Sequence, residues 1–77
     1  MISRSDLSPS ISVVLPAFNE AGNLGAVVPW ILAALAPLSQ QVELIVVDDG
    51  SRDATSHVMQ SLCAAHPEVV YLKLSRN

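Results

Sequence analysis

The chain has 77 residues, a net charge of -3, 51% hydrophobic residues and 14% charged residues. A chain of this length forms at most one domain and buries only about 60% of the surface of its unfolded form, so we expect marginal stability. Its four basic side chains form no cluster, which argues against nucleic acid or an anionic membrane as a direct partner of this segment. The single cysteine excludes a disulfide framework.

The first ten residues are polar and lack the apolar middle of a signal peptide, so residues 1–10 are interpreted as a flexible leader to a domain over residues 11–77. The domain begins with a mostly apolar, largely β-branched run from Ile11 to Leu15. Such a run is typical of a parallel strand that is covered on both faces. We expect Pro16 to end this strand.

A helix is predicted next, with Asn23 as its cap and an apolar stripe that begins at Leu24. Pro29 interrupts the pattern, so we expect either a kink or a helix that starts late. The uncharged stretch Leu24 to Leu38 is shorter than the roughly 20 residues that span a bilayer. It is therefore interpreted as a buried or interfacial helix.

The run from Val42 to Val47 predicts a central strand, and Gly50 supplies the freedom for a tight turn after it. Asp53 is well placed to cap a helix over residues 54–65. The inner stripe of this helix is expected to hold Val58, Leu62 and Ala65.

His66-Pro67 should stop the second helix, and the alternation over Val69 to Leu74 predicts a third strand. The resulting β-α-β-α-β order predicts an α/β fold, a three-stranded parallel sheet that is half of a doubly wound, Rossmann-like domain. We expect the spatial order 3-2-1, with the first strand at an edge and a topological switch between the first two strands. Two open sheet edges indicate the front of a larger domain, or self-association through an edge.

Two polar clusters follow the first two predicted strands: Pro16 to Glu20, and Asp48 to Ser51. The carboxyl ends of strands are where open α/β sheets hold ligands, so the two clusters predict one acidic pocket. Asp48 to Ser51 could also be only a turn and a helix start, because Asp, Gly and Ser are common turn residues. Cys63 is interpreted as a packing residue, and the two histidines as surface residues.

The segments Val14 to Glu20 and Val46 to Thr55 resemble the opening of family 2 glycosyltransferases, which have the GT-A fold. The similarity extends from Ile11 to Asn77, and it favours the branch of polyprenyl- or dolichyl-phosphate sugar synthases. It implies transfer of a sugar, with inversion, from a UDP- or GDP-linked donor to a lipid phosphate. It also implies a place at the cytoplasmic face of a membrane for the full-length protein.

Carried over by position, the resemblance implies a nucleoside site in which Asp49 accepts a hydrogen bond from a ring N–H of the base. Phe18 stands where the family commonly has Tyr, which keeps a stacking face and loses a hydroxyl contact. Asp48 is included in the site, although it is expected to point into the turn. The implied nucleotide-sugar-binding residues are Pro16, Ala17, Phe18, Glu20, Val47, Asp48 and Asp49.

The family's Asp-x-Asp element, which holds Mg²⁺ or Mn²⁺ on the diphosphate, has no counterpart in this sequence, nor do its acceptor-binding helices. We therefore expect no catalytic residue and no metal ligand in this chain, and no sugar transfer by the chain alone.

Two alternatives remain at this point. The string from Ile45 to Asp49 also fits the start of a receiver-like domain, whose paired aspartates bind Mg²⁺. The other alternative is a nonenzymatic nucleotide-binding α/β fragment that keeps the fold without turnover.

Overall fold

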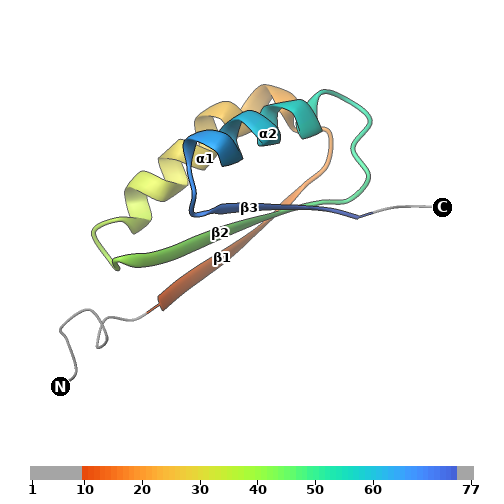
Figure 1. Ribbon diagram of the computed structural model, residues 1–77. Coiled ribbons are helices and arrows are strands. Elements are labelled where there is room, and N and C mark those ends of the chain that lie inside the picture. The colour runs from red at the N-terminus through yellow and green to blue at the C-terminus, as the bar shows by residue number, and fades with distance from the viewer. Residues whose placement is uncertain (1–9, 75–77) are drawn as a thin grey trace, which may run out of the picture.

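The computed structural model describes residues 10–74, and it has the element order β-α-β-α-β (Figure 1). The elements are β1 (Ser10–Ala17), α1 (Ala21–Leu35), β2 (Gln41–Asp48), α2 (Thr55–Ala65) and β3 (Val69–Lys73). The predicted leader lies outside the described residues except for Ser10, which already belongs to β1. Residues 75–77 also lie outside them.

The three strands form one parallel sheet in the order β1-β2-β3, with Val13 beside Leu44 and Leu44 beside Val69. This confirms the predicted fold class and the predicted 3-2-1 order, with β1 at an edge of the sheet. The order advances in one direction across these three strands. The prediction of a topological switch between β1 and β2 was therefore wrong, because a switch requires the order to reverse.

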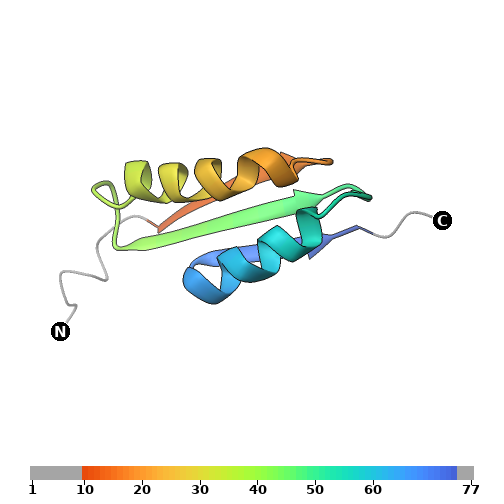
Figure 2. The same ribbon diagram turned by 90° about the horizontal axis from the view of Figure 1, so that it is seen from above.

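Both helices lie on the same face of the sheet (Figures 1 and 2). Two right-handed crossovers that step in the same direction across a sheet carry their helices to the same side. The prediction that β1 is covered on both faces was therefore wrong for this chain. Val14, which points away from the helices, is 61% exposed.

The hydrophobic core lies between this covered face of the sheet and the two helices. Leu44 and Val46 of β2 are fully buried there, opposite Val28 of α1 and Met59 of α2. Val58 and Leu62 of α2 pack against the core as predicted, but the prediction was wrong for Ala65, which is exposed. Met59, which was not predicted, is the fully buried hydrophobic residue that α2 contributes to the core.

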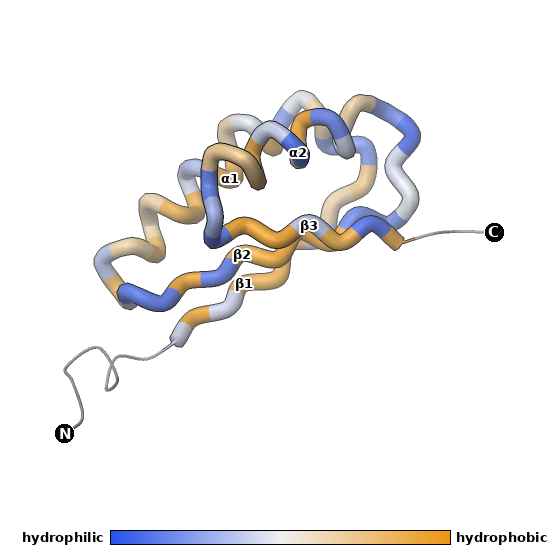
Figure 3. Tube along the Cα trace, viewed as in Figure 1, coloured by the Kyte–Doolittle hydropathy of each residue, from blue (hydrophilic) through white to orange (hydrophobic). Residues whose placement is uncertain are grey.

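The other face of the sheet carries apolar side chains that no element between residues 10 and 74 covers. Val14, Leu72 and Leu74 are the most exposed of them, and Ile45 and Val47 lie between the outer strands, half-buried. Figure 3 shows hydrophobic residues along all three strands. We call this surface the open face of the sheet.

Strand β1 continues through Pro16 to Ala17, so the prediction that Pro16 ends it was wrong. A proline can stand within an edge strand because its missing N–H faces the side that has no neighbouring strand.

Helix α1 begins at Ala21, before Asn23, and runs through Pro29 to Leu35 as one helix (Figure 2). The predictions of an Asn23 cap and of a late start were therefore wrong. Asn23 instead lies in the first turn, where its side-chain amide donates to Glu20 Oε2 at 2.9 Å. Asp53, in the loop after β2, accepts the Ala21 amide at the start of α1, and Thr55, the first residue of α2, accepts the Glu20 amide before it.

Helix α2 ends as predicted, because His66 has an extended backbone conformation before Pro67. None of the helices over residues 10–74 is long and apolar enough to cross a membrane.

Candidate functional site

The two polar clusters meet at the carboxyl ends of β1 and β2, as the parallel register requires. Ala17 pairs with Asp48 at the last rung, and the Asp49 amide donates to the Ala17 carbonyl at 3.1 Å. Side chains alternate between the two faces of a strand. Asp48 therefore points to the helices, and Asp49 points to the opposite side.

Asp48 is fully buried and hydrogen-bonded within the protein. Its Oδ1 accepts the Ser51 amide at 2.8 Å, and its Oδ2 accepts the Tyr71 hydroxyl at 2.5 Å. Burial acts to raise the pKa of Asp48, but hydrogen bonds from Ser51 and Tyr71, with the nearby charge of Lys73, outweigh it and lower that pKa. Asp48 thus holds the turn after β2 and is turned away from any ligand.

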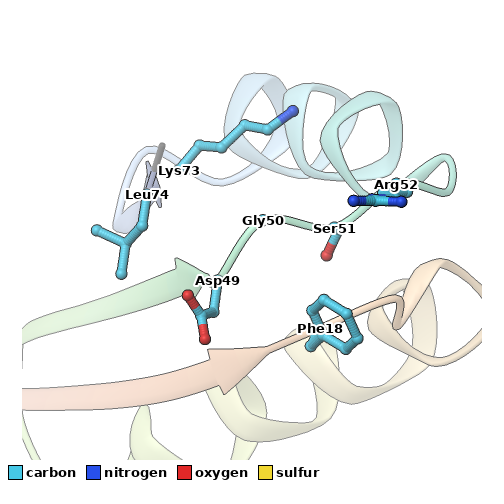
Figure 4. Close-up of a pocket in the computed structure, with 7 residues that line it drawn as sticks. All are labelled: Phe18, Asp49, Gly50, Ser51, Arg52, Lys73 and Leu74. Carbon is cyan, nitrogen blue, oxygen red and sulfur yellow. The ribbon is translucent and has the colours of Figure 1, made fainter. Parts of the chain in front are cut away.

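Asp49 and Phe18 line one open pocket of about 710 Å³ above the ends of β1 and β2 (Figure 4). Phe18 is 56% exposed, so its ring offers a free face to a flat ligand. In Figure 4, Phe18 and Asp49 lie on the same side of the turn at Gly50 and Ser51. We call this the Phe18–Asp49 pocket, and its lining residues are Phe18, Asp49, Gly50, Ser51, Arg52, Lys73 and Leu74.

The other members of the predicted site lie elsewhere. Pro16 and Glu20 line a separate hollow of about 260 Å³ beside the start of α1. Ala17 is 4% exposed and belongs to the core. Val47 is half-buried on the open face of the sheet. The structure therefore brings Phe18 and Asp49 together in one pocket, and the other predicted residues do not line it.

Two cationic residues of the pocket, Arg52 and Lys73, were missed by sequence reasoning. Lys73 Nζ donates to Ser56 Oγ at 2.9 Å, so its side chain runs along the pocket wall toward α2 (Figure 4). Arg52 directly follows the Asp48 to Ser51 cluster, and that position was the available signal. The role of Lys73 depends on the register of β3 beside β2, where Lys73 pairs with Asp48.

Hydrogen bonds link the loop between β1 and α1 with the loop between β2 and α2. The Asn19 amide donates to Ser51 Oγ at 2.8 Å, and the Arg52 amide donates to Asn19 Oδ1 at 2.8 Å. Asn19 has a φ of 51°, in the left-handed region that asparagine tolerates better than most residues. The two walls of the pocket are therefore fixed relative to each other.

The start of α1 is not arranged to receive a phosphate. Helix N-termini bind anions through amides that lack intrahelical partners. Here the Glu20 amide donates to Thr55 Oγ1 at 3.1 Å and the Ala21 amide donates to Asp53 Oδ2 at 3.2 Å. A carboxylate already stands where the anion would bind.

Within residues 10–74, the structure brings no three His, Cys, Asp or Glu side chains together in a group that could hold a metal ion. Asp48 is engaged by Ser51 and Tyr71, and Asp53 by Thr55 and Ala21. These two carboxylates are therefore already engaged within the protein.

Comparison with known proteins agrees with this geometry. Residues 12–77 match the model of glycosyl transferase family 2. The chain belongs to this family. Its parallel three-stranded sheet corresponds to the N-terminal half of the GT-A, Rossmann-like domain of this family.

The relatives of this glycosyltransferase chain include enzymes named for lipid-phosphate acceptors. Two are undecaprenyl-phosphate 4-deoxy-4-formamido-L-arabinose transferases, from Aeromonas hydrophila (37% identical over 68 residues) and Photorhabdus laumondii (39% over 69 residues). A third is the prophage bactoprenol glucosyl transferase homolog of Escherichia coli, 34% identical over 67 residues. Each alignment covers 87% of this chain and 21% or 22% of the relative.

The chain therefore spans about a fifth of the length of these curated relatives. Their names place them in a polyprenyl-phosphate branch of the family, which confirms the predicted resemblance. The receiver-like alternative is not favoured, because the family match covers both motifs and because Asp48 and Asp49 point to opposite faces.

Proposed function

We propose that this chain forms the base-recognition part of the donor site in an inverting family 2 glycosyltransferase that transfers a sugar from a nucleotide-sugar to a polyprenyl phosphate. The observation that carries the proposal is the Phe18–Asp49 pocket, where the two family motifs meet at adjacent strand ends. The names of the relatives support the lipid-phosphate acceptor.

The chemistry of the pocket favours a base that presents a ring N–H. A carboxylate is an acceptor only, so Asp49 suits uracil or guanine, whereas cytosine and adenine present an unprotonated ring nitrogen. A hydrogen bond to a charged group contributes about 1.5–3 kcal/mol, or about 10- to 100-fold in affinity. Phe18 supplies a stacking face for the base. The donor is therefore a UDP-linked or GDP-linked sugar.

The diphosphate of the donor is expected on the Arg52 and Lys73 side of the pocket, because the first amides of α1 are engaged and Asp53 repels an anion there. Mg²⁺ or Mn²⁺, which the family uses to neutralise the leaving diphosphate, would be held by residues outside this chain. The same holds for the acceptor site and the catalytic residues. The 77-residue chain alone therefore transfers no sugar.

Pro16, Ala17, Glu20 and Val47 remain part of the proposal as residues that shape the strand ends around the nucleoside. Asp48 contributes by holding the turn. The full-length enzyme would act at the cytoplasmic face of a membrane, where polyprenyl phosphates are glycosylated. The open sheet edge at β1 would pair with a further strand or with a second copy.

Nucleotide titration of the 77-residue chain, followed by amide NMR, tests the base-recognition role. We expect UDP or GDP to shift the resonances of Phe18, Asp49 and Gly50, and CDP and ADP to bind more weakly. Asp49→Asn should weaken the preferred nucleotide, while Glu43→Gln, an exposed acidic site on β2 outside the pocket, should not. Equal binding of all four nucleotides would contradict the proposal.

Incubation of the chain with Mg²⁺ or Mn²⁺, labelled nucleotide-sugars and a polyprenyl phosphate tests the prediction that it is inactive alone. We expect no glycolipid, because the metal and acceptor sites are missing. Product above background would show that the chain carries a complete site.

A further inference from the structure

One carboxylate caps both helices of the fold. Asp53 Oδ1 accepts the Thr55 amide, the first of α2, at 2.9 Å, and it also accepts the Thr55 hydroxyl. Asp53 Oδ2 accepts the Ala21 amide, the first of α1, at 3.2 Å. Asp53 was predicted to cap the second helix, and it does accept the first amide of α2, although the N-cap position is Ala54 and not Asp53. Its bond to α1, 32 residues away, was not foreseen.

Thr55 also joins the start of α2 to the start of α1. It is fully buried, and its Oγ1 accepts the Glu20 amide at 3.1 Å while its own hydroxyl donates to Asp53. With the bonds of Asn19 to Ser51 and Arg52, four hydrogen bonds join segments 32 to 35 residues apart. We call these four bonds the loop clamp.

The residues of the loop clamp are close neighbours in sequence of Phe18 and Asp49. Phe18 precedes Asn19, and Asp49 stands two residues before Ser51, which receives the Asn19 amide. Loops on a sheet edge otherwise retain backbone freedom, and ordering that freedom during binding costs affinity. A clamp that is already formed removes this cost.

We propose that Asp53 is a positioning residue for nucleotide recognition, which holds Phe18 opposite Asp49 by capping α1 and α2 with one carboxylate. This inference rests on the proposed function of the Phe18–Asp49 pocket. Asp53 does not line that pocket, so its effect on a nucleotide is transmitted through the clamp.

The charge of Asp53 suits this role. Hydrogen bonds from Thr55 hold the pKa of Asp53 below its usual value, so the carboxylate is ionised at neutral pH. A negative charge at two helix N-termini is favourable for both helix dipoles. The same charge keeps phosphate groups away from the start of α1 and leaves the Arg52 and Lys73 side of the pocket for them.

The test compares Asp53→Ala and Asp53→Asn with the unaltered 77-residue chain and with Glu43→Gln as the matched loss of a carboxylate outside the clamp. UDP and GDP affinities are measured by amide NMR titration, and hydrogen exchange of the Glu20 and Ala21 amides reports the clamp. The folded fraction of each variant, from circular dichroism in a urea series, corrects the apparent affinity.

We expect Asp53→Ala to accelerate exchange of both amides and to weaken the preferred nucleotide by about tenfold after correction for folding. Asp53→Asn keeps one acceptor oxygen, so its amide exchange rates and its nucleotide affinity should lie between those of Asp53→Ala and the unaltered chain. Glu43→Gln should change the affinity less than about twofold. A purely structural Asp53 would lower the folded fraction and leave the corrected affinity unchanged, which would overturn the proposal.

If neither Asp53 variant folds, Asn19→Gly provides the second test. Glycine keeps the positive φ and the amide bond to Ser51, and it removes only the acceptor of the Arg52 amide. We expect about a threefold loss of affinity, and an unchanged affinity would overturn the proposal. Failure of the unaltered chain to bind either nucleotide would count against the proposed function itself, and the positioning role would fall with it.

Discussion

The two faces of β2 differ in what surrounds them, although both carry aliphatic residues in the second half of the strand. Leu44 and Val46 on the helix side are completely buried, whereas Ile45 and Val47 on the open face are only half-buried. The contrast continues at the carboxyl end of the strand. Asp48, its last residue, accepts hydrogen bonds from Ser51 and Tyr71, whereas Asp49, the next residue, lines an open pocket. One face of the strand thus supports the fold, and the other presents the site.

The largest expected effect lies on the covered face. Met59→Ala should lower the free energy of unfolding by about 2–5 kcal/mol, because it leaves a cavity at the centre of the core. In a chain of this size such a loss approaches the total stability. Urea unfolding followed by circular dichroism measures it. A loss below that of Leu72→Ala, on the open face, would contradict the comparison.

The second effect concerns the buried carboxylate. Asp48→Ala leaves the Ser51 amide without its acceptor, at about 1–3 kcal/mol for an unsatisfied group, and it leaves the Tyr71 hydroxyl with Ser56 Oγ as its remaining partner. Asp49→Ala should lower the free energy of unfolding less than Asp48→Ala does, because Asp49 is only half-buried. The same urea experiment distinguishes them, and equal losses would show that the two aspartates share one environment.

The third prediction concerns nucleotide affinity, for which Asp49 should matter more than Asp48. Asp49→Ala should weaken UDP or GDP by about 10- to 100-fold, because the base loses its charged acceptor. Asp48→Ala, measured where it is still folded and corrected for the unfolded fraction, should weaken binding less. Equal losses in the NMR titration would remove the distinction between a fold-supporting and a ligand-facing aspartate.

A smaller effect is expected on the pH dependence of the free energy of unfolding. The folded-state pKa of Asp48 is lowered from its ordinary value of 3.8, so its contribution to stability is present above that value and is lost as the pH falls through the folded-state pKa. Asp48→Asn should therefore make the free energy of unfolding less dependent on pH in the acid range below about pH 4. Urea midpoints measured across that range test this, and parallel pH profiles would contradict it.

The smallest effect is expected on the open face itself. Leu72→Ser removes an apolar side chain that is 48% exposed and should change the free energy of unfolding by less than about 0.5 kcal/mol. It should also reduce any self-association, because apolar surface on this face is lost. Sedimentation of the two chains at high concentration measures the second effect.

The sequence alone was sufficient for the element order, the parallel sheet and the family. Hydrophobic periodicity, proline and glycine positions and the two motifs are local signals, and they appear wherever neighbouring residues decide the conformation. Phe18 and Asp49 were predicted to share one site for the same reason, since both follow directly after a strand. The C-terminal limit of α2 at His66 was predicted from Pro67 next to it.

The errors arose where residues distant in sequence decide the outcome. Asn23 was expected to cap α1, but the amides at the start of that helix are accepted by Asp53, in the loop after β2, and by Thr55, the first residue of α2. Pro16 was expected to end β1, yet a proline is compatible with an edge strand. Arg52 and Lys73 join the pocket only through the turn after β2 and the register of β3.

What the sequence by itself determined is therefore the pattern along each strand and helix, including the alternation that separates Asp48 from Asp49. The tertiary structure alone decided which face of the sheet the helices cover and which loop caps which helix. The physical reason is that periodicity acts between neighbours in the chain, whereas a hydrogen bond such as Asp53 to Ala21 exists only after two strands have paired in register and both helices have packed on one side.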